Sequence, residues 1–258
     1  MKPEKNIFLS VVIPVYNEQD RIEPALQDTF SYLAGLREPW EVWVVNDGSQ
    51  DRTVEIVKAW MKRQPGLQLI DMPINRGKGV AVREGMLHAR GRYRLFRDAD
   101  ISTKMRELDR FRPYWERGVE VLVGCRKMPG AHVVRHQPFF REMMGKGFTW
   151  LCRFLLVWDI LDYTCGFKCF SEKATRDIFS RQKIRRWAYD AEILFLAQKM
   201  GYHIAQIPVT WADDSGTKVR IWLDALRSFV EILRIRFNSA YGLYHFPRNQ
   251  KREGVGVG

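Results

Sequence analysis

Two aspartates, Asp98 and Asp100, stand one residue apart at the end of the apolar stretch YRLFR. This stretch is typical of a short strand, and the backbone is still nearly extended where such a strand turns into a loop. Two short carboxylates placed there can converge on one hard cation, and Ala99 between them adds no bulk. Proteins hold Mg²⁺ or Mn²⁺ with one or two carboxylates plus substrate phosphate oxygens. The pattern therefore favours a metal-assisted diphosphate site, although the same pair in isolation is more often a solvated acidic turn.

Strands and helices alternate through the first half of the chain and must position this pair. Continuous apolar runs predict buried strands at residues 8–16, 41–46, 67–72, 93–97 and 119–124. Helical patterns fill the intervals at about 20–36, 52–63 and 75–89. This alternation predicts βαβ units, and hence an α/β fold with a mainly parallel sheet flanked by helices and joined by right-handed crossovers.

Polar residues follow each of these five strands. In an open parallel sheet, ligands bind beyond the carboxyl ends of the strands, so we expect these residues to share one edge. They are Tyr16 and Glu18, Asp47, Arg76 and Lys78, Asp98 and Asp100, and Arg126. Agreement among five separate segments favours a binding site at that edge over five unrelated loops.

Asp47 and Lys78 each have a chemical use at this edge. Asp47 can accept a hydrogen bond from a base N–H or a ribose hydroxyl, or it is simply a turn aspartate before Gly48. Arg76 and Lys78 lie among glycines at a helix start, where backbone N–H groups and the helix dipole favour phosphate. Taken alone, Lys78 also fits a solvated loop lysine. The segment matches neither G-x-x-x-x-G-K-[ST] nor G-x-G-x-x-G, so no P-loop or dinucleotide fingerprint is predicted.

Composition limits the class of partner. The 258 residues carry a net charge of +12 and a pI near 9.7, which implies an anionic partner such as nucleic acid, acidic lipid or a phosphorylated substrate. The basic residues are not interleaved with a recognisable nucleic-acid module, so nucleic acid is not expected. We predict neither a signal peptide nor a transmembrane helix. The four cysteines lack metal-ligand spacing and are expected to be reduced thiols in a cytosolic protein.

The second half of the chain is less regular and ends in an amphipathic helix. Helices are expected at residues 138–158, 172–180 and 186–200, and a strand at 204–211. In the last helix, 219–237, arginines recur every seven residues beside an apolar face made of Trp222, Leu223, Leu226, Phe229, Val230, Leu233 and Phe237. A basic-edged apolar face suits a membrane interface. The alternative is that this face packs on the domain as core.

At this point the sequence resembles the family-2 glycosyltransferases of GT-A (Rossmann-like) fold, over about residues 7–238. The general markers are VVIPVYNE (11–18), VNDGSQD (45–51), NRGKG (75–79), RDAD (97–100) and VGCR (123–126). More specific markers are DYTCGFKCF (162–170), RWAYDAE (186–192) and VTW followed by SGTKV (215–219). These are similar to the dolichyl-phosphate β-glucosyltransferase branch, close to the polyprenyl-phosphate mannose synthases.

The resemblance implies a role for each matched residue. Nucleotide-sugar binding would fall to Pro14, Tyr16, Glu18, Val45, Asp47, Arg76, Lys78, Asp98, Ala99, Asp100 and Lys218. Asp98 and Asp100 would hold Mg²⁺ or Mn²⁺, with Ser102 as a third contact. Arg126 and Lys168 would bind the acceptor phosphate. Asp100, Arg126, Asp162 and Asp190 form the expected catalytic set. Mannose synthases carry an additional arginine where this chain has Ala212, which weakens the mannose interpretation.

The expected function is an inverting transfer of a hexose, with glucose favoured, from a UDP-sugar to undecaprenyl or dolichyl phosphate. A single domain (1–240) would hold a nucleotide-sugar half (about 7–130) and an acceptor and membrane-facing half (about 131–240), followed by a disordered tail (241–258). We expect a cytoplasmic protein, peripheral at the inner membrane face; its oligomeric state is not predicted. The alternatives are a GDP-mannose-dependent enzyme, a transferase with a non-lipid glycan acceptor, and a binding protein without catalysis.

Overall fold

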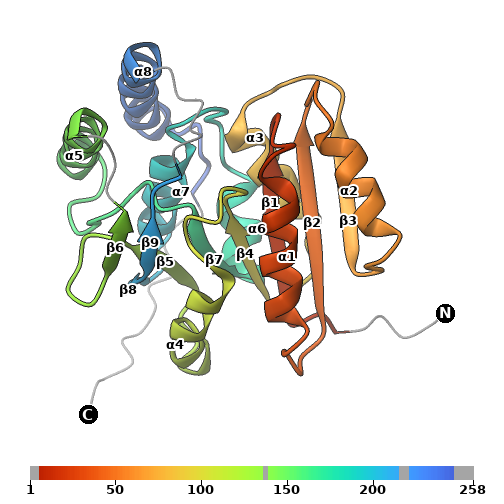
Figure 1. Cartoon of the computed structure of the whole chain (residues 1–258). Helices are drawn as coiled ribbons and strands as arrows, with labels where there is room; N and C mark the ends of the chain where they lie inside the picture. Colours follow the sequence, from red (N-terminus) through yellow and green to blue (C-terminus); the bar gives the residue numbers. More distant parts are fainter. Residues whose placement is uncertain (1–5, 136–138, 215–220, 247–258) are drawn as a thin grey trace.

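The computed structural model describes residues 6–135, 139–214 and 221–246. A seven-stranded sheet runs through the molecule in the order β3-β2-β1-β4-β7-β5-β8 (Figure 1). Its strands are β1 (Leu9–Val15), β2 (Trp40–Asp47), β3 (Leu67–Met72), β4 (Tyr93–Arg97), β5 (Val121–Cys125), β7 (Phe167–Ser171) and β8 (Ile204–Pro208). All pairs are parallel except those made by β7. The predicted α/β fold with a mainly parallel sheet is confirmed.

Helices cover both faces of the sheet, which explains the continuous apolar runs in its strands. One face carries α1 (Ile22–Leu33), α2 (Thr53–Met61), the 3₁₀ helix η1 (Met105–Arg110) and α4 (Arg112–Glu116). The other carries α3 (Lys78–His88), α6 (Glu172–Phe179) and α7 (Tyr189–Lys199). Alternate residues of β1 feed the two cores: Val11 and Ile13 pack under α1, and Val12 packs under α3.

Three details differ from the sequence expectation. Strand β7 inserts antiparallel between β4 and β5, burying Phe167 in one core and Phe170 in the other. The expected strand at 204–211 is two strands, because the chain leaves the sheet after β8 and pairs β9 (Thr210–Ala212) with β6 (His132–Arg135). The segments η1, α4 and β6 were not anticipated. Their apolar residues are too few to show a period, and tertiary packing decides their structure.

Two helices at one side of the sheet, α5 (Phe139–Leu155) and α8 (Ile221–Ala240), pack on each other (Figure 1). Helix α8 buries Ile232 and Ile235 against the domain and leaves the predicted stripe residues Phe229, Val230, Leu233 and Phe237 exposed. The side chains of Trp222, Leu223 and Leu226 lie outside the described residues. In the described part of α8, the predicted apolar face is therefore a second, uncovered face rather than core.

Helix α5 also leaves aromatic side chains exposed. Trp150 and Phe154 are 62% and 67% exposed and their rings stack on each other. Trp158, just beyond the helix, is also exposed, and the Arg153 guanidinium lies over its ring. Among the described residues, neither these helices nor any other has the length and apolar character needed to cross a bilayer.

Candidate active site

The carboxyl ends of β1, β2, β4 and β5, together with the chain after β3, meet at one edge of the sheet, as the sequence predicts. Asn17, after β1, accepts a hydrogen bond from Gln50 N and donates its own backbone N–H to Ser49 Oγ, both beyond β2. The segment after β3 is joined to β2 by Asp47 and to β4 by Lys78. Hydrogen bonds therefore connect four of the five predicted segments directly.

Asp47 organises the loop that precedes α3. Its carboxylate accepts backbone N–H bonds from Arg76 at 2.7 Å and Gly77 at 2.9 Å, and the residue is 2% exposed. Burial raises the pKa of Asp47, against the lowering effect of these two N–H groups. The structure thus shows Asp47 holding the loop in place; its predicted contact with the nucleoside stays a prediction.

Lys78 connects this loop to the aspartate pair. Its Nζ lies 2.6 Å from Asp98 Oδ1, and the ring of Trp187 lies beside the same ammonium, 5.8 Å from Nζ to the ring centre. Burial lowers the pKa of Lys78, but the carboxylates of Asp98 and Asp190 outweigh it and raise the pKa overall. Lys78 is therefore a permanent cation next to the aspartates, rather than the freely solvated loop lysine that was the alternative.

Asp98 and Asp100 project from a tight turn after β4. The backbone N–H of Asp98 donates to Gly166 O, and Asp100 Oδ1 accepts from Ser102 N at 3.1 Å. Ile101, between Asp100 and Ser102, adopts φ 47°, a left-handed conformation that is strained for a β-branched residue. Burial raises the pKa of Asp100, and the neighbouring Asp98 adds to the increase. Two carboxylates held this close favour a cation between or beside them.

The residues of this turn fit a divalent cation. Ser102 Oγ is buried without a hydrogen-bond partner, and the residue lines a recess of about 10 Å³ together with Asp98, Asp100, Thr103, Gly166 and Trp211. Within the described ranges, no cluster of three or more His, Cys, Asp or Glu side chains could hold a metal. The two carboxylates and the hydroxyl would therefore need oxygen ligands from a bound diphosphate, which is how Mg²⁺ sites are usually completed.

Arg126 is fixed beyond β5 by a buried carboxylate. Asp162 accepts from Arg126 Nε and Nη2, both at 2.7 Å, and from its backbone N–H at 3.0 Å. Thr164 Oγ1 accepts from Nη2, and the guanidinium lies over the ring of Trp211. Asp162 is fully buried, and although burial raises its pKa, Arg126 holds it far below the usual range. Asp162 thus positions Arg126.

Lys168 and Asp190 form a second buried pair. Lys168 is fully buried, and its Nζ donates to Asp190 Oδ1 at 2.5 Å and to Cys165 O at 2.6 Å. Burial raises the pKa of Asp190 against the effect of Lys168 and Lys78. This geometry does not support the predicted contact between Lys168 and an acceptor phosphate. It favours a role in joining β7 to the start of α7.

The remaining predicted residues are placed as follows. Tyr16 is 40% exposed beyond β1, and Glu18 is ion-paired to Arg21 at 2.6 Å. Pro14 and Val45 are register partners with buried side chains, and Ala99 is also buried, so only their backbone can face a nucleoside. The Arg76 side chain is exposed. Lys218 lies outside the described residues.

Three residues of the site were not singled out from the sequence. Trp187 and Trp211 appeared only inside the markers RWAYDAE and VTW, yet they lie beside Lys78 and over Arg126. Gly166 allows the closest approach: a Cβ atom there would lie 2.0 Å from Asp98 Oδ2. These contacts join segments distant in the sequence, so no local pattern could have revealed them.

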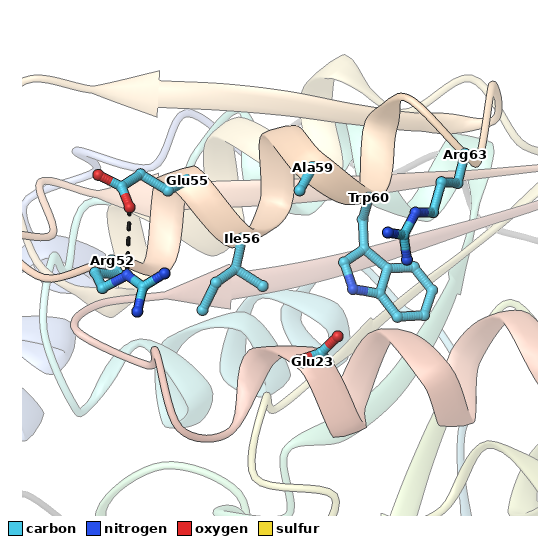
Figure 2. Close-up of a pocket in the computed structure, with 7 residues that line it drawn as sticks. All are labelled: Glu23, Arg52, Glu55, Ile56, Ala59, Trp60 and Arg63. Carbon is cyan, nitrogen blue, oxygen red and sulfur yellow. Dashed lines mark hydrogen bonds and ion pairs between the residues drawn. The ribbon is translucent and has the colours of Figure 1, made fainter.

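A second recess lies elsewhere on the molecule. A groove of about 200 Å³ between α1 and α2 is lined by Glu23, Arg52, Glu55, Ile56, Ala59, Trp60 and Arg63 (Figure 2). Its charged side chains lie at the surface, and Arg52 is paired with Glu55 at 3.4 Å. None of the residues at the aspartate turn lines it. The candidate active site is therefore identified by the charged groups that converge at the strand ends, and not by this groove.

Known proteins with similar sequences identify the family of this chain. The profile described as Glycosyl transferase family 2 matches residues 10–179, so the chain belongs to that family. A dolichyl-phosphate beta-glucosyltransferase from Dictyostelium discoideum is 34% identical over 94% of this chain and 78% of that protein. Proteins of the same description from Saccharomyces cerevisiae and Homo sapiens are 34% and 32% identical, over 93% and 94% of this chain and 78% and 79% of their own lengths.

Solved structures support the fold. Mannosyl-3-phosphoglycerate synthase from Rubrobacter xylanophilus superposes with a TM-score of 0.67 at 17% identity, over 98% of this chain and 79% of that one. Glucosyl-3-phosphoglycerate synthase from Mycobacterium tuberculosis, crystallised with Mn²⁺, UDP and glucosyl-3-phosphoglycerate, gives 0.64 at 19% identity, over 94% and 82%. The GT-A fold expected from the sequence is confirmed, and the chain is a glycosyltransferase similar to the dolichyl-phosphate β-glucosyltransferases.

Proposed function

We propose that this enzyme transfers glucose from UDP-glucose to a polyprenyl phosphate, with inversion at the anomeric carbon. The observation that carries the proposal is the row of charges at the strand ends: Asp98 and Asp100, with Lys78 bonded to the first and Arg126 nearby. A diphosphate leaving group and a phosphate nucleophile both need such cations. The sugar and the acceptor class are those in the names of its relatives, the dolichyl-phosphate beta-glucosyltransferases.

The transfer itself needs little proton chemistry. An oxygen of the acceptor phosphate attacks the anomeric carbon and forms the new C–O bond, while the bond from that carbon to the diphosphate oxygen breaks and UDP leaves. Because the phosphate is already anionic, no general base has to remove a proton. Arg126, which Asp162 and Trp211 hold in position, would orient the acceptor phosphate. Orientation of this kind supplies much of the rate in such reactions.

Asp98, Asp100 and Ser102 would hold Mg²⁺ or Mn²⁺. When bound, the cation would neutralise charge on the departing diphosphate. Lys78 would share that charge from the side of α3. The ion pair with Asp98 supports this role, because it holds the ammonium beside the carboxylates that would bind the cation.

We further propose that the exposed face of α5 and α8 lies on the membrane that holds the lipid acceptor. It comprises Trp150, Phe154, Phe229, Val230, Leu233 and Phe237. On α8, exposed Arg236 borders the apolar residues on one side, and Arg227 and Arg234 on the other. Arginines beside an apolar face can reach lipid phosphates while the rings enter the interface. The cytoplasmic face is supported by the four free, buried cysteines.

The proposal is tested by incubating the enzyme in detergent with labelled UDP-glucose, undecaprenyl or dolichyl phosphate, and Mn²⁺ or Mg²⁺. We expect labelled lipid from the wild type and almost none from Asp100→Ala. Asp109→Ala, the same change at an exposed aspartate of η1, is the matched control and should keep its rate. Product from GDP-mannose alone would overturn the donor. Transfer only to 3-phosphoglycerate or another soluble acceptor would overturn the lipid assignment.

A further inference from the structure

The loop between α6 and α7, residues 180–188, lies directly against the first turn of α3. Gln182 Nε2 donates to Gly79 O at 2.8 Å, and Val80 N donates to Arg185 O at 3.3 Å. The approach is close enough that a Cβ atom on Gly77 would lie 2.4 Å from Arg185 O. This α6–α7 loop therefore supports the helix start that carries Lys78, and it also carries Trp187 beside the Lys78 ammonium.

On its other side the same loop is held by the C-terminal part of the chain. The buried Glu192 carboxylate accepts from the backbone N–H groups of Lys183 at 3.0 Å and Ile184 at 2.8 Å. Tyr244, 1% exposed and located just after α8, donates to Glu192 Oε1 at 2.6 Å. Glu231 of α8 accepts from Ala188 N at 3.0 Å. The Ala188 end of the loop segment 183–188 is thus bonded directly to α8, and its Lys183 end is bonded to Glu192 of α7, which Tyr244 supports.

We propose that Tyr244 and Glu231 are positioning residues for the donor site. They hold the α6–α7 loop against α3, and the loop in turn keeps Lys78 aligned with Asp98. Neither residue needs to touch a substrate. The inference rests on the proposed function for the identity of the donor, and it adds that the helix carrying the exposed apolar face also maintains the geometry of the nucleotide-sugar side of the site.

The direct test compares Tyr244→Phe and Glu231→Gln with a matched control. Tyr202→Phe is suitable because Tyr202 is also buried and also donates its hydroxyl to a carboxylate, that of Asp177 in α6, whereas Tyr244 donates to the carboxylate that accepts from Lys183 and Ile184. Loss of one such hydrogen bond corresponds to about a 5- to 10-fold change in affinity. We expect the UDP dissociation constant and the donor KM to rise by about this factor in both test variants, with kcat changed far less. Tyr202→Phe should leave both donor constants unchanged.

A merely structural role would lower the melting temperature of all three variants without separating them in donor binding, and that result would overturn the proposal. Hydrogen exchange gives an independent reading. Tyr244→Phe should speed exchange at the Lys183 and Ile184 amides, because their acceptor Glu192 loses the hydrogen bond that holds it. Glu231→Gln should speed exchange at the Ala188 amide, because its acceptor loses its charge. Unchanged exchange would also overturn it. If the wild type binds neither UDP nor GDP, the proposed function fails. The exchange rates then still decide whether Tyr244 and Glu231 hold the α6–α7 loop.

Discussion

Helices α1 and α8 are both amphipathic, but the fold uses their apolar faces differently. In α1, Phe30 is 6% exposed and packs between the rings of Trp40 and Trp60. In α8, Phe229 and Phe237 are 41% and 56% exposed, and the helix uses other residues, Ile232 and Ile235, to pack on the domain. One helix has a single apolar face and the other has two.

This difference shows that a helical apolar stripe indicates a face in need of a partner, but not which partner it finds. For α1 the partner is the sheet. Helix α8 packs on the domain through a separate set of residues, Ile232 and Ile235. The apolar stripe with its bordering arginines therefore remains at the surface, together with Trp150 and Phe154 of α5. The reactive edge and the uncovered face are therefore distinct parts of the molecule, and substitutions should separate them.

The largest effect is expected at the reactive edge. Asp98→Asn removes the charge that Lys78 is bonded to and half of the carboxylate pair. Loss of one preorganised electrostatic group typically lowers kcat by about 100- to 1,000-fold. Initial rates of sugar transfer would show this loss, whereas vesicle binding should be unchanged. Asp109→Asn serves as the control, and comparable rates for the two variants would contradict the assignment of the edge.

The contrast between the two helices is tested by the same substitution in each region. Phe30→Ala should lower the free energy of unfolding by about 3–5 kcal/mol, because it opens a cavity between two tryptophans. Phe154→Ala should change it by less than about 0.5 kcal/mol, because the ring is at the surface. Urea unfolding measures both. Phe154→Ala should instead weaken binding to vesicles of acidic lipid, and a stability loss as large as that of Phe30→Ala would show that α5 is covered.

A substitution at Gly166 tests whether the position of the Asp98 carboxylate matters for activity. In Gly166→Ala the new methyl group would overlap Asp98 Oδ2, so the carboxylate must turn away from the recess. We expect a loss of about 10- to 100-fold in kcat/KM, since a misplacement of about 1 Å has effects of this size. Gly147→Ala in α5 is the control, because a Cβ atom there meets nothing within 4 Å. Equal activity of the two variants would show that Asp98 can shift without consequence.

The last prediction concerns the dependence of stability on pH. Burial raises the pKa of Glu192 to about 7, with Glu231 adding to it and hydrogen bonds from Tyr244 and the Ile184 and Lys183 amides opposing it. The unfolded carboxyl has a pKa of 4.5, so between these values the folded state binds more protons and stability falls as pH rises. The loss should be about 3 kcal/mol, and it should be nearly complete about one pH unit above the folded pKa. Urea unfolding of Glu192→Gln should show a shallower decline; an identical slope would contradict the shifted pKa.

The first half of the chain was readable from sequence because its strands are continuous apolar runs and its polar groups follow them directly. That is why the positions of Asp47, Lys78 and Asp98 at one edge could be predicted. The pairing of Lys168 with Asp190 could not be predicted, because it depends on β7 entering the sheet antiparallel. The apolar periodicity of a strand is the same for both strand directions. The exposure of the α8 stripe likewise depends on which face meets the domain.

The most direct test of the central claim, that one edge transfers sugar and a separate face meets the lipid, uses two acceptors of different solubility. Transfer from UDP-glucose would be measured to undecaprenyl phosphate in acidic vesicles and to a short, water-soluble prenyl phosphate, for the wild type and a Phe154→Ser, Phe237→Ser double variant. We predict that the variant loses about 10-fold or more with the vesicle acceptor, in line with burial of two aromatic rings in the interface, and keeps its rate with the soluble one. Equal loss or equal retention with both acceptors would contradict the account.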